Sequence, residues 1–365
     1  MKFIAIVFLA LIAALAPFAC GSFLVDELVS RANIACERAG INERPLIVHK
    51  GYLESQISLD EPLSTTISSL GLEPEVVDFL REYNLKAESD VYHNPYKGLL
   101  GKAETRVLVD GPNWKIEGTE ELLKKFNGAE ESKLTFGNVL AEDGALLICF
   151  SNCFSVSQKA GFFGDGLETR ETKADLLVLS PFACKKAALF QSKNKTEREI
   201  KLSFGALSYG ESFSASNLTL NANIERDGKK AAVDVLFSAL TKNAEKFSDG
   251  NLKLQAEGLD CEELLEALRE NKFSKLRPSY LFSEGAALEG TLTTASGNVS
   301  LHLKINGSIP DSFSELLANL EGELKIQGKE QKLLESFFKN LPPSGDGAWL
   351  LQIDKGKVTV NGVAL

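Results

Sequence analysis

The sequence predicts an α+β fold: a large, curved, antiparallel β-sheet with amphipathic helices packed on one face, after an apolar N-terminal segment. Two stretches, 218–225 and 299–306, alternate apolar and polar residues, which is typical of antiparallel strands that bury one face. Asp260 and Ser312 are each followed three residues later by a glutamate and then by leucines, the spacing of a helix N-terminal capping box. Strands and helices are therefore expected to alternate in the second half of the chain.

Residues 1–22 predict a signal peptide or an N-terminal membrane anchor. Lys2 is the only charge before Asp26, and the residues between them are almost all apolar. Three outcomes stay open: cleavage near the Gly21–Ser22 bond, lipid attachment at Cys20, or retention as an anchor, since about 20 apolar residues cross a bilayer. Each places the rest of the chain outside the cytoplasm, in the periplasm or at the cell surface.

The N-terminal region, residues 23–195, is expected to mix helices and strands. Apolar residues at a spacing of four predict the helix that begins at Phe23, and Thr119 is a helix-capping residue before a short run that ends at Asn127-Gly128. The expected helices cover 23–39, 75–83 and 120–126, and the expected extended segments cover 46–59, 105–110, 113–117, 134–139, 145–150 and 174–179.

The C-terminal region, residues 196–365, is expected to be richer in strand. The boundary is placed in the polar run 192–197. A weak internal repeat is predicted, in which 213–270 and 286–339 each run hairpin, helix, strand, helix. The expected strands cover 200–204, 218–225, 231–237, 299–306, 349–353 and 357–360, and a helix is expected over 329–339.

The cysteines predict no metal centre. Cys149 and Cys153 bracket three residues: on a hairpin loop they would face each other as a candidate disulfide, whereas on one continuous strand they would lie about 13 Å apart and could not bond. The other cysteines are isolated and the chain has three histidines, too few convergent ligands for zinc. Cys20 is the candidate lipidation site.

No catalytic or cofactor motif is present. The chain has no glycine-rich phosphate loop, no GxSxG elbow and no HExxH. His49, His93 and His302 share no motif; His302 is expected to face solvent, and His93 to be structural. A Ser-His-Asp arrangement assembled from distant residues stays open. A net charge of −10 argues against a nucleic-acid partner. We expect no enzyme and no cofactor.

Several segments together carry a resemblance to a known family: 48–55, 90–95, 252–268, 297–305 with 320–338, and the ending 354–362. In this order they resemble the YdgA-like family, a bacterial exported or membrane-anchored family of unknown function. Departures occur at Val48, which stands where the family has tyrosine, and at Asn94, which replaces a glycine. The resemblance implies export and membrane anchoring, and it supplies no catalytic residues.

The function expected from the sequence is that of a non-enzymatic extracytoplasmic cell-envelope protein with a structural or protein-interaction role. The alternative is a protein that binds or transports a lipid or another hydrophobic ligand in an apolar groove. The expected partners are the membrane, through the N-terminal segment, and a lipid or an envelope protein. An apolar groove would favour the ligand, and a closed core with exposed sheet edges would favour the interaction role. A pocket that holds a histidine near a serine or a carboxylate would indicate an enzyme.

Overall fold

The computed structural model divides into two compact units, Met1–Ala183 (unit 1) and Cys184–Leu365 (unit 2). The polar run 192–197 lies inside unit 2, at the turn between two strands, where the amide of Asn194 donates to the carbonyl of Glu197 at 2.9 Å. The residues that the structure describes are 16–17, 19–34, 46–62, 78, 81–93, 99–112, 115–143, 146–225, 229–242, 245–260, 263, 277–328 and 348–364.

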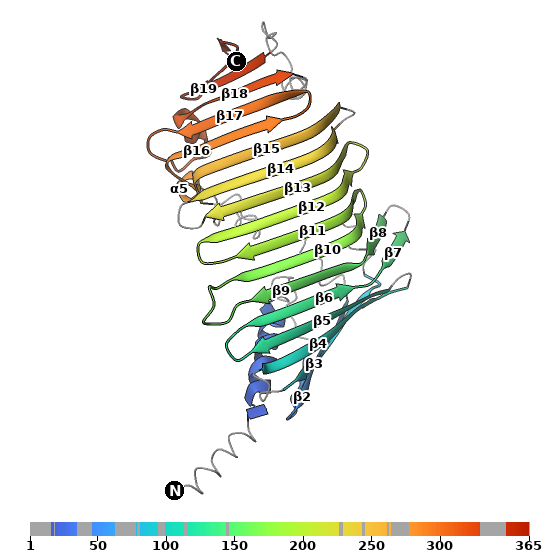
Figure 1. The fold of residues 1–365 in the computed structure, drawn as a ribbon. Helices are drawn as coiled ribbons and strands as arrows, with labels where there is room; N and C mark the ends of the chain where they lie inside the picture. Colours follow the sequence, from blue (N-terminus) through green and yellow to red (C-terminus); the bar gives the residue numbers. More distant parts are fainter. Residues whose placement is uncertain are drawn as a thin grey trace, which may run out of the picture. The chain divides into compact units, whose positions relative to one another are not determined.

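Unit 1 is an antiparallel sheet in which sequence neighbours pair along most of its width (Figure 1). Strands β1 to β6 pair in order; β9 then lies between β6 and β10, and β8 lies between β7 and β10. The strands are β1 (Ile47–His49), β2 (Glu54–Pro62), β3 (Asn84–Tyr92), β4 (Leu99–Asp110), β5 (Lys115–Lys125), β6 (Glu130–Phe136), β7 (Val139–Asp143), β8 (Leu146–Ser151), β9 (Cys153–Lys159) and β10 (Glu168–Leu179).

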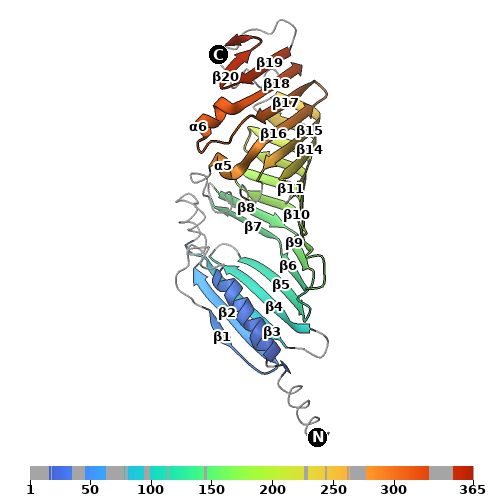
Figure 2. The ribbon, with the colours of Figure 1, turned by 90° about the vertical axis from the view of Figure 1, so that its left-hand side faces the viewer.

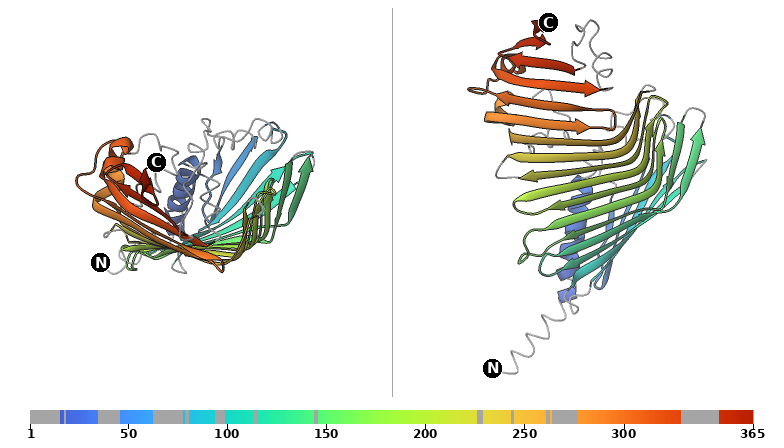
Figure 3. Two further views of the ribbon diagram at one scale, coloured as in Figure 1. Left: turned by 90° about the horizontal axis from the view of Figure 1, so that it is seen from above. Right: turned by 45° about the horizontal axis from the view of Figure 1, so that its top comes forward.

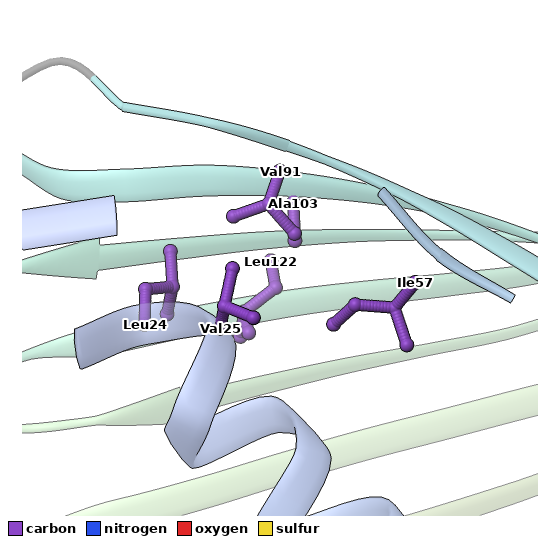
Figure 4. Close-up of a cluster of buried hydrophobic side chains, with 6 residues drawn as sticks. All are labelled: Leu24, Val25, Ile57, Val91, Ala103 and Leu122. Carbon is purple, nitrogen blue, oxygen red and sulfur yellow. The ribbon is translucent and has the colours of Figure 1, made fainter. Parts of the chain in front are cut away.

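An N-terminal helix, described over residues 16–34 except for residue 18, lies on one face of this sheet (Figure 2). Leu24 and Val25 are at most 1% exposed. They pack against side chains of four strands, Ile57, Val91, Ala103 and Leu122 (Figure 4). We call this covered side the inner face of unit 1. The predicted helix over 23–39 is thus confirmed as far as residue 34, and its last residues lie outside the described part.

In unit 1 two strand pairs share one register across a short break. β6 pairs with β9, and β7 pairs with β8 in the same register. The break falls at residues 137–138 between β6 and β7, and at Asn152 between β8 and β9. Asn152 adopts a φ of 47°, a left-handed conformation that asparagine tolerates better than most residues. Its side-chain amide donates to Asp175 at 2.7 Å, and its backbone amide donates to Asn138 at 3.1 Å. These bonds stabilise the break.

Unit 2 is a meander of long antiparallel strands. From β12 to β21 each strand pairs with the next in sequence. The strands are β11 (Phe182–Lys193, its first two residues in unit 1), β12 (Glu197–Tyr209), β13 (Phe213–Glu225), β14 (Lys230–Lys242), β15 (Glu245–Leu259), β16 (Phe282–Thr293), β17 (Gly297–Ile305), β18 (Leu320–Gly328), β19 (Ala348–Asp354), β20 (Lys357–Val360) and β21 (Val363–Ala364).

The longest strands of unit 2 bend partway along their length (Figure 3). Lys186, Asn217 and Asp249, on alternate strands β11, β13 and β15, have φ values of 51°, 47° and 51°. The pairing of β12 with β13, of β13 with β14 and of β14 with β15 keeps one register on both sides of Asn217 and Asp249, so neither strand contains an extra residue there. The alternation of apolar side chains nevertheless shifts by one in β13, from Phe213 and Ala215 before Asn217 to Leu218 and Leu220 after it.

Short helices accompany the C-terminal strands: α5 (Pro278–Leu281), α6 (Phe313–Leu316) and the 3-10 helix η4 (Leu317–Asn319). The Ser312 hydroxyl accepts from the Glu315 amide at 3.3 Å, so the predicted cap is confirmed. Leu316 then packs against Ala286 and Ile305.

The predicted α+β class is wrong. The described structure is about 69% strand and 11% helix, a nearly all-antiparallel protein. In the described part of the chain, the helix over 16–34 is the only one longer than a single turn. The expected repeat fails in 213–259, where the strands β13, β14 and β15 follow one another in sequence with few residues between them. The Glu263 amide does donate to Asp260 at 3.1 Å, as a cap would, but most of the helix predicted there, and the one over 329–339, lie outside the described residues.

The helix predicted over 120–126 is also wrong, because this segment belongs to β5. Its glutamates, leucines and lysines favour helix in isolation. In the protein β5 pairs along its length with β4 and with β6, so its backbone groups are bonded on both sides. Tertiary pairing outweighs a propensity difference of a few tenths of a kcal/mol per residue.

Candidate functional site

A cavity of about 440 Å³ lies between the N-terminal helix and the inner face of unit 1. Alternation along the strands directs apolar side chains to it, and the helix adds Leu28 and Ala32. Its apolar wall consists of Leu28, Ala32, Leu46, Ile57, Leu59, Ala87, Ala103 and Leu122. The volume falls in the range of roughly 300–1,000 Å³ that small-molecule sites occupy.

A polar stripe crosses the cavity on neighbouring strands. The Thr105 hydroxyl donates to Ser89 at 3.0 Å, and the Ser132 hydroxyl donates to the Glu120 carboxylate at 2.8 Å. Ser157, opposite Ser132 on β9, extends the stripe. Hydroxyls of this kind offer a donor and two acceptor positions each, so the stripe is suited to a neutral polar group.

Ion pairs join the helix to the sheet at one side of the cavity. Arg31 forms a two-pronged ion pair with the Glu130 carboxylate, with N–O distances of 2.7 and 2.6 Å, and bonds to Glu27 at 2.6 Å. Lys124 bonds to Glu27 from β5. The Arg31 guanidinium holds the pKa of Glu130 below its ordinary value, although burial opposes the shift. The two cations and two carboxylates balance, so this cluster has no net charge.

A buried histidine–serine pair lies at another point beneath the helix. The Ser55 hydroxyl and Nε2 of His93 are 3.2 Å apart, while Nδ1 of His93 is 3.0 Å from the carbonyl of Tyr52. The pair resembles a nucleophile and its base, but Ser55 is 3% exposed and His93 is 5% exposed. Gly21 lies against the imidazole, since a Cβ there would meet the ring at 2.1 Å. The predicted structural role of His93 agrees with this sealed environment.

The same contact bears on the N-terminal segment. Pro17, Gly21 and Leu24 are buried on both sides of the proposed Gly21–Ser22 cleavage point, and the helix is continuous through it. Cleavage there would remove the residue that covers His93. Cys20, the candidate lipidation site, is half-buried in this helix and its thiol is free; burial raises its pKa.

Cys149 and Cys153 lie on β8 and β9, which pair in one register with β10. This is the continuous-strand geometry, and both thiols are free. Burial raises the pKa of Cys153 above its ordinary value, which lowers its thiolate fraction. The hairpin-loop alternative for the candidate disulfide is therefore not what the structure contains. Cys36 and Cys261 lie outside the described residues.

The apolar face of unit 2 is an uninterrupted surface. One row of cross-strand neighbours is apolar across seven strands: Leu220, Val235, Leu252, Leu292, Val299, Ile326 and Trp349. The first five are half-buried and the last two are buried. Two clusters of three buried residues lie in the described part of this unit, around Ile305 and around Ile326. Ala215, Phe237, Phe247 and Ala256 are buried outside these clusters. The row itself is therefore buried at β18 and β19 and in partial contact with solvent on the five strands before them.

The opposite face of unit 2 is polar. His302 is exposed there and its Nδ1 lies 3.3 Å from Glu289, as predicted for the polar side of an alternating strand. A hollow of about 630 Å³ beside it is lined by residues of both charge signs, including Lys304 and Glu323. This mixture defines no site for an ion of one sign.

The described ranges contain neither a clustered metal-ligand set nor a membrane-spanning helix. No group of three or more histidine, cysteine, aspartate or glutamate side chains in those ranges is arranged to hold a metal ion. No helix within them combines the length and apolarity needed to cross a membrane. Residues 1–15 lie outside the described part.

Sequence reasoning missed the residues that define the cavity. Arg31 and Glu130 are 99 positions apart, and no sequence pattern connects them. The one available signal was the Glu27–Arg31 spacing of four on a helix, which indicates a charged stripe and not its partner on the sheet. Comparisons add no further assignment: no protein-family model, no curated protein and no solved structure matches the chain. The resemblance to the YdgA-like family stays a prediction.

Proposed function

We propose that the protein binds a small neutral amphiphile, such as a single-chain lipid, with its hydrocarbon chain in the cavity beneath the N-terminal helix. The observation that carries the proposal is the cavity itself, about 440 Å³ in volume with an apolar wall and a hydroxyl stripe. Apolar walls with a few placed polar groups are typical of small-molecule sites. The wall takes the chain, and the stripe takes a neutral polar head.

The charges around the cavity favour a neutral ligand over a fatty acid. Arg31 is already bonded to two carboxylates, those of Glu27 and Glu130. An anionic head would have to displace one of them and would also approach Glu120, which lines the cavity. If a ligand carboxylate replaces a protein carboxylate on Arg31, one charge-assisted hydrogen bond is lost for each one formed, so the net gain in binding free energy is small. A hydroxyl head incurs no such exchange.

The apolar face of unit 2 supports the same class of ligand independently. Its half-buried leucines and valines keep hydrocarbon partly in water, and a closed core would bury such side chains completely. A structural or protein-interaction role in the cell envelope stays the alternative, and it would be favoured by a closed core with exposed edges. The sealed Ser55–His93 pair offers no route for a substrate to its hydroxyl, so we do not propose an enzyme.

We also propose that binding takes place outside the cytoplasm, in the periplasm or at the cell surface. The support is the apolar composition of residues 1–22, which predicts export or anchoring. All three fates of that segment keep the cavity on the same side of the membrane.

The test is titration of the purified full chain with a monoacylglycerol that carries a fluorescent acyl chain, and with the fatty acid of the same chain. Ala32→Trp places an indole in the cavity, and Ile34→Trp places one on the same helix at a residue that is 45% exposed. We expect the parent and I34W to bind the monoacylglycerol and A32W to bind at least about tenfold more weakly, a difference of ~1.4 kcal/mol.

The proposal fails if the parent does not bind the monoacylglycerol, or if A32W and I34W bind it equally. Tighter binding of the fatty acid would contradict the argument from the paired charges while leaving the cavity as the site.

A further inference from the structure

Two neighbouring connections of unit 1 form an exposed aromatic tip, defined here as Phe126, Phe162 and Phe163. The connection between β9 and β10 carries Phe162 and Phe163, which are 82% and 96% exposed, and the turn between β5 and β6 carries Phe126, which is 48% exposed. Both connections lie at the same ends of the strands, on one side of the sheet (Figure 1). Single exposed apolar residues are ordinary, whereas a group of aromatic side chains at a loop tip marks an interaction site.

The tip is held in place by backbone bonds between and within the two connections. The Phe162 amide donates to the carbonyl of Asn127 at 2.6 Å, and the Ala160 amide donates to Leu167 at 2.8 Å. Gly128 has a φ of 80°, and a Cβ there would meet the Phe162 ring at 2.8 Å. The ring thus lies against the turn of β5 and β6, and Phe163 projects beyond it. The exposure belongs to an ordered surface.

The tip is continuous with the rim of the cavity. The turn that carries Phe126 ends at Glu130, the first residue of β6, and Glu130 bonds to Arg31 beside the cavity. The charges next to the tip balance. Lys159 lies 3.3 Å from Glu168, Lys124 bonds to Glu27, and the remaining two residues, Lys125 and Asp165, carry opposite charges. Attraction at the tip is therefore mainly apolar.

We propose that the aromatic tip inserts into the interfacial layer of a lipid bilayer and places the cavity rim beside it. Aromatic side chains on a narrow projecting tip fit that layer, where apolar rings meet the boundary between head groups and chains. A protein partner would call for a broader surface, since specific protein interfaces bury about 800 Å² per partner. This inference rests on the proposed function only for the role of the tip, which is delivery of a lipid to the cavity. The geometry of the tip does not depend on the proposed function.

The test uses the full chain with zwitterionic phosphatidylcholine vesicles whose acyl chains carry bromine, a contact quencher of tryptophan. Phe163→Trp reports from the tip. Leu140→Trp is the matched control, because Leu140 is 68% exposed on β7 of the same unit. The two tryptophans of the parent chain are measured separately as background. We expect the added F163W signal to be largely quenched, the added L140W signal to be little changed, and the quenching to persist at high salt.

Equal quenching of both reporters, or none at F163W, overturns the proposal. So does quenching that disappears in high salt, because balanced charges on a zwitterionic surface leave little electrostatic attraction to screen. A parent that self-associates while the double variant F162S/F163S stays monomeric, without quenching at F163W, would assign the tip to contact between copies of the chain. Titration of the cavity without vesicles is a separate measurement, so failure at the tip and failure of ligand binding are distinguishable.

Discussion

Leu24→Ala tests whether the N-terminal helix is an integral part of unit 1. Leu24 is 1% exposed and packs in the cluster that joins the helix to β2, β3, β4 and β5. The substitution removes hydrocarbon from this cluster and leaves the helix backbone intact. If the helix is docked as described, the whole loss falls on the stability of unit 1.

The expected loss follows from the groups removed. Three carbon groups at about 0.8 kcal/mol each give about 2.4 kcal/mol of lost burial. The neighbouring side chains project from paired strands, and the helix is held by the Arg31–Glu130 ion pair, so the site collapses only in part. The remaining void raises the expected loss to about 3–4 kcal/mol.

Urea unfolding of the full chain, followed by circular dichroism, measures the effect. With a urea dependence of roughly 2 kcal/mol per molar for a unit of this size, the transition of unit 1 should fall by about 1.5–2 M. Phe23→Ala is the control. Phe23 precedes Leu24 and is 58% exposed, and Nζ of Lys124 lies 5.9 Å from the centre of its ring. Its replacement should therefore cost less than about 1 kcal/mol. Equal shifts for the two variants would refute the docked helix.

Three further predictions concern particular contacts. Arg31→Ala should lower the stability of unit 1 by about 1–2 kcal/mol at pH 7. Arg31 lowers the pKa of Glu130, so the difference in stability between the parent and R31A should persist above pH 4.5, the ordinary carboxyl value. It should vanish as the pH falls through the lowered pKa. A difference that is constant with pH would contradict the ion pair. Asn217→Val should destabilise unit 2 by about 1–2 kcal/mol, because a β-branched residue resists the positive φ, whereas Asn223→Val on the same strand should be neutral or stabilising in the same thermal unfolding assay. Gly250→Ala should cost about 1–3 kcal/mol, since a Cβ would meet a buried phenyl ring at 1.9 Å; an unchanged midpoint would show that the ring moves freely.

The strands of unit 2 were predictable where the alternation of side chains is clean. Leu218 to Ile224 and Val299 to Ile305 alternate with polar residues, and both segments are strands with the expected faces. The hairpin between 105–110 and 113–117 was also correct, since Asp110 pairs with Lys115 across its turn. Alternation is a property of neighbouring residues, so the sequence contains it in full.

The segment around Leu122 was not predictable in this way. Its residues favour helix, and only pairing with β4 and β6 makes it a strand. The left-handed residues within long strands were also hidden, because the apolar alternation shifts by one at such a residue and a long strand then reads as two short ones. The strand predicted over 200–204 extends in the structure over Glu197–Tyr209; the pair of Gly205 with Asn217 is missing, and the register is the same on both sides of it.

The sequence by itself determined which face of each alternating strand is apolar, where the tight turns fall, and that the first residues form an apolar segment. These are local properties, set by side-chain periodicity and by backbone preference. Only the tertiary structure decided that the fold is nearly all strand, that Arg31 meets Glu130, and that a cavity opens beneath the helix. Those outcomes depend on register between segments far apart in the chain, and a shift of one residue would turn every inward side chain outward.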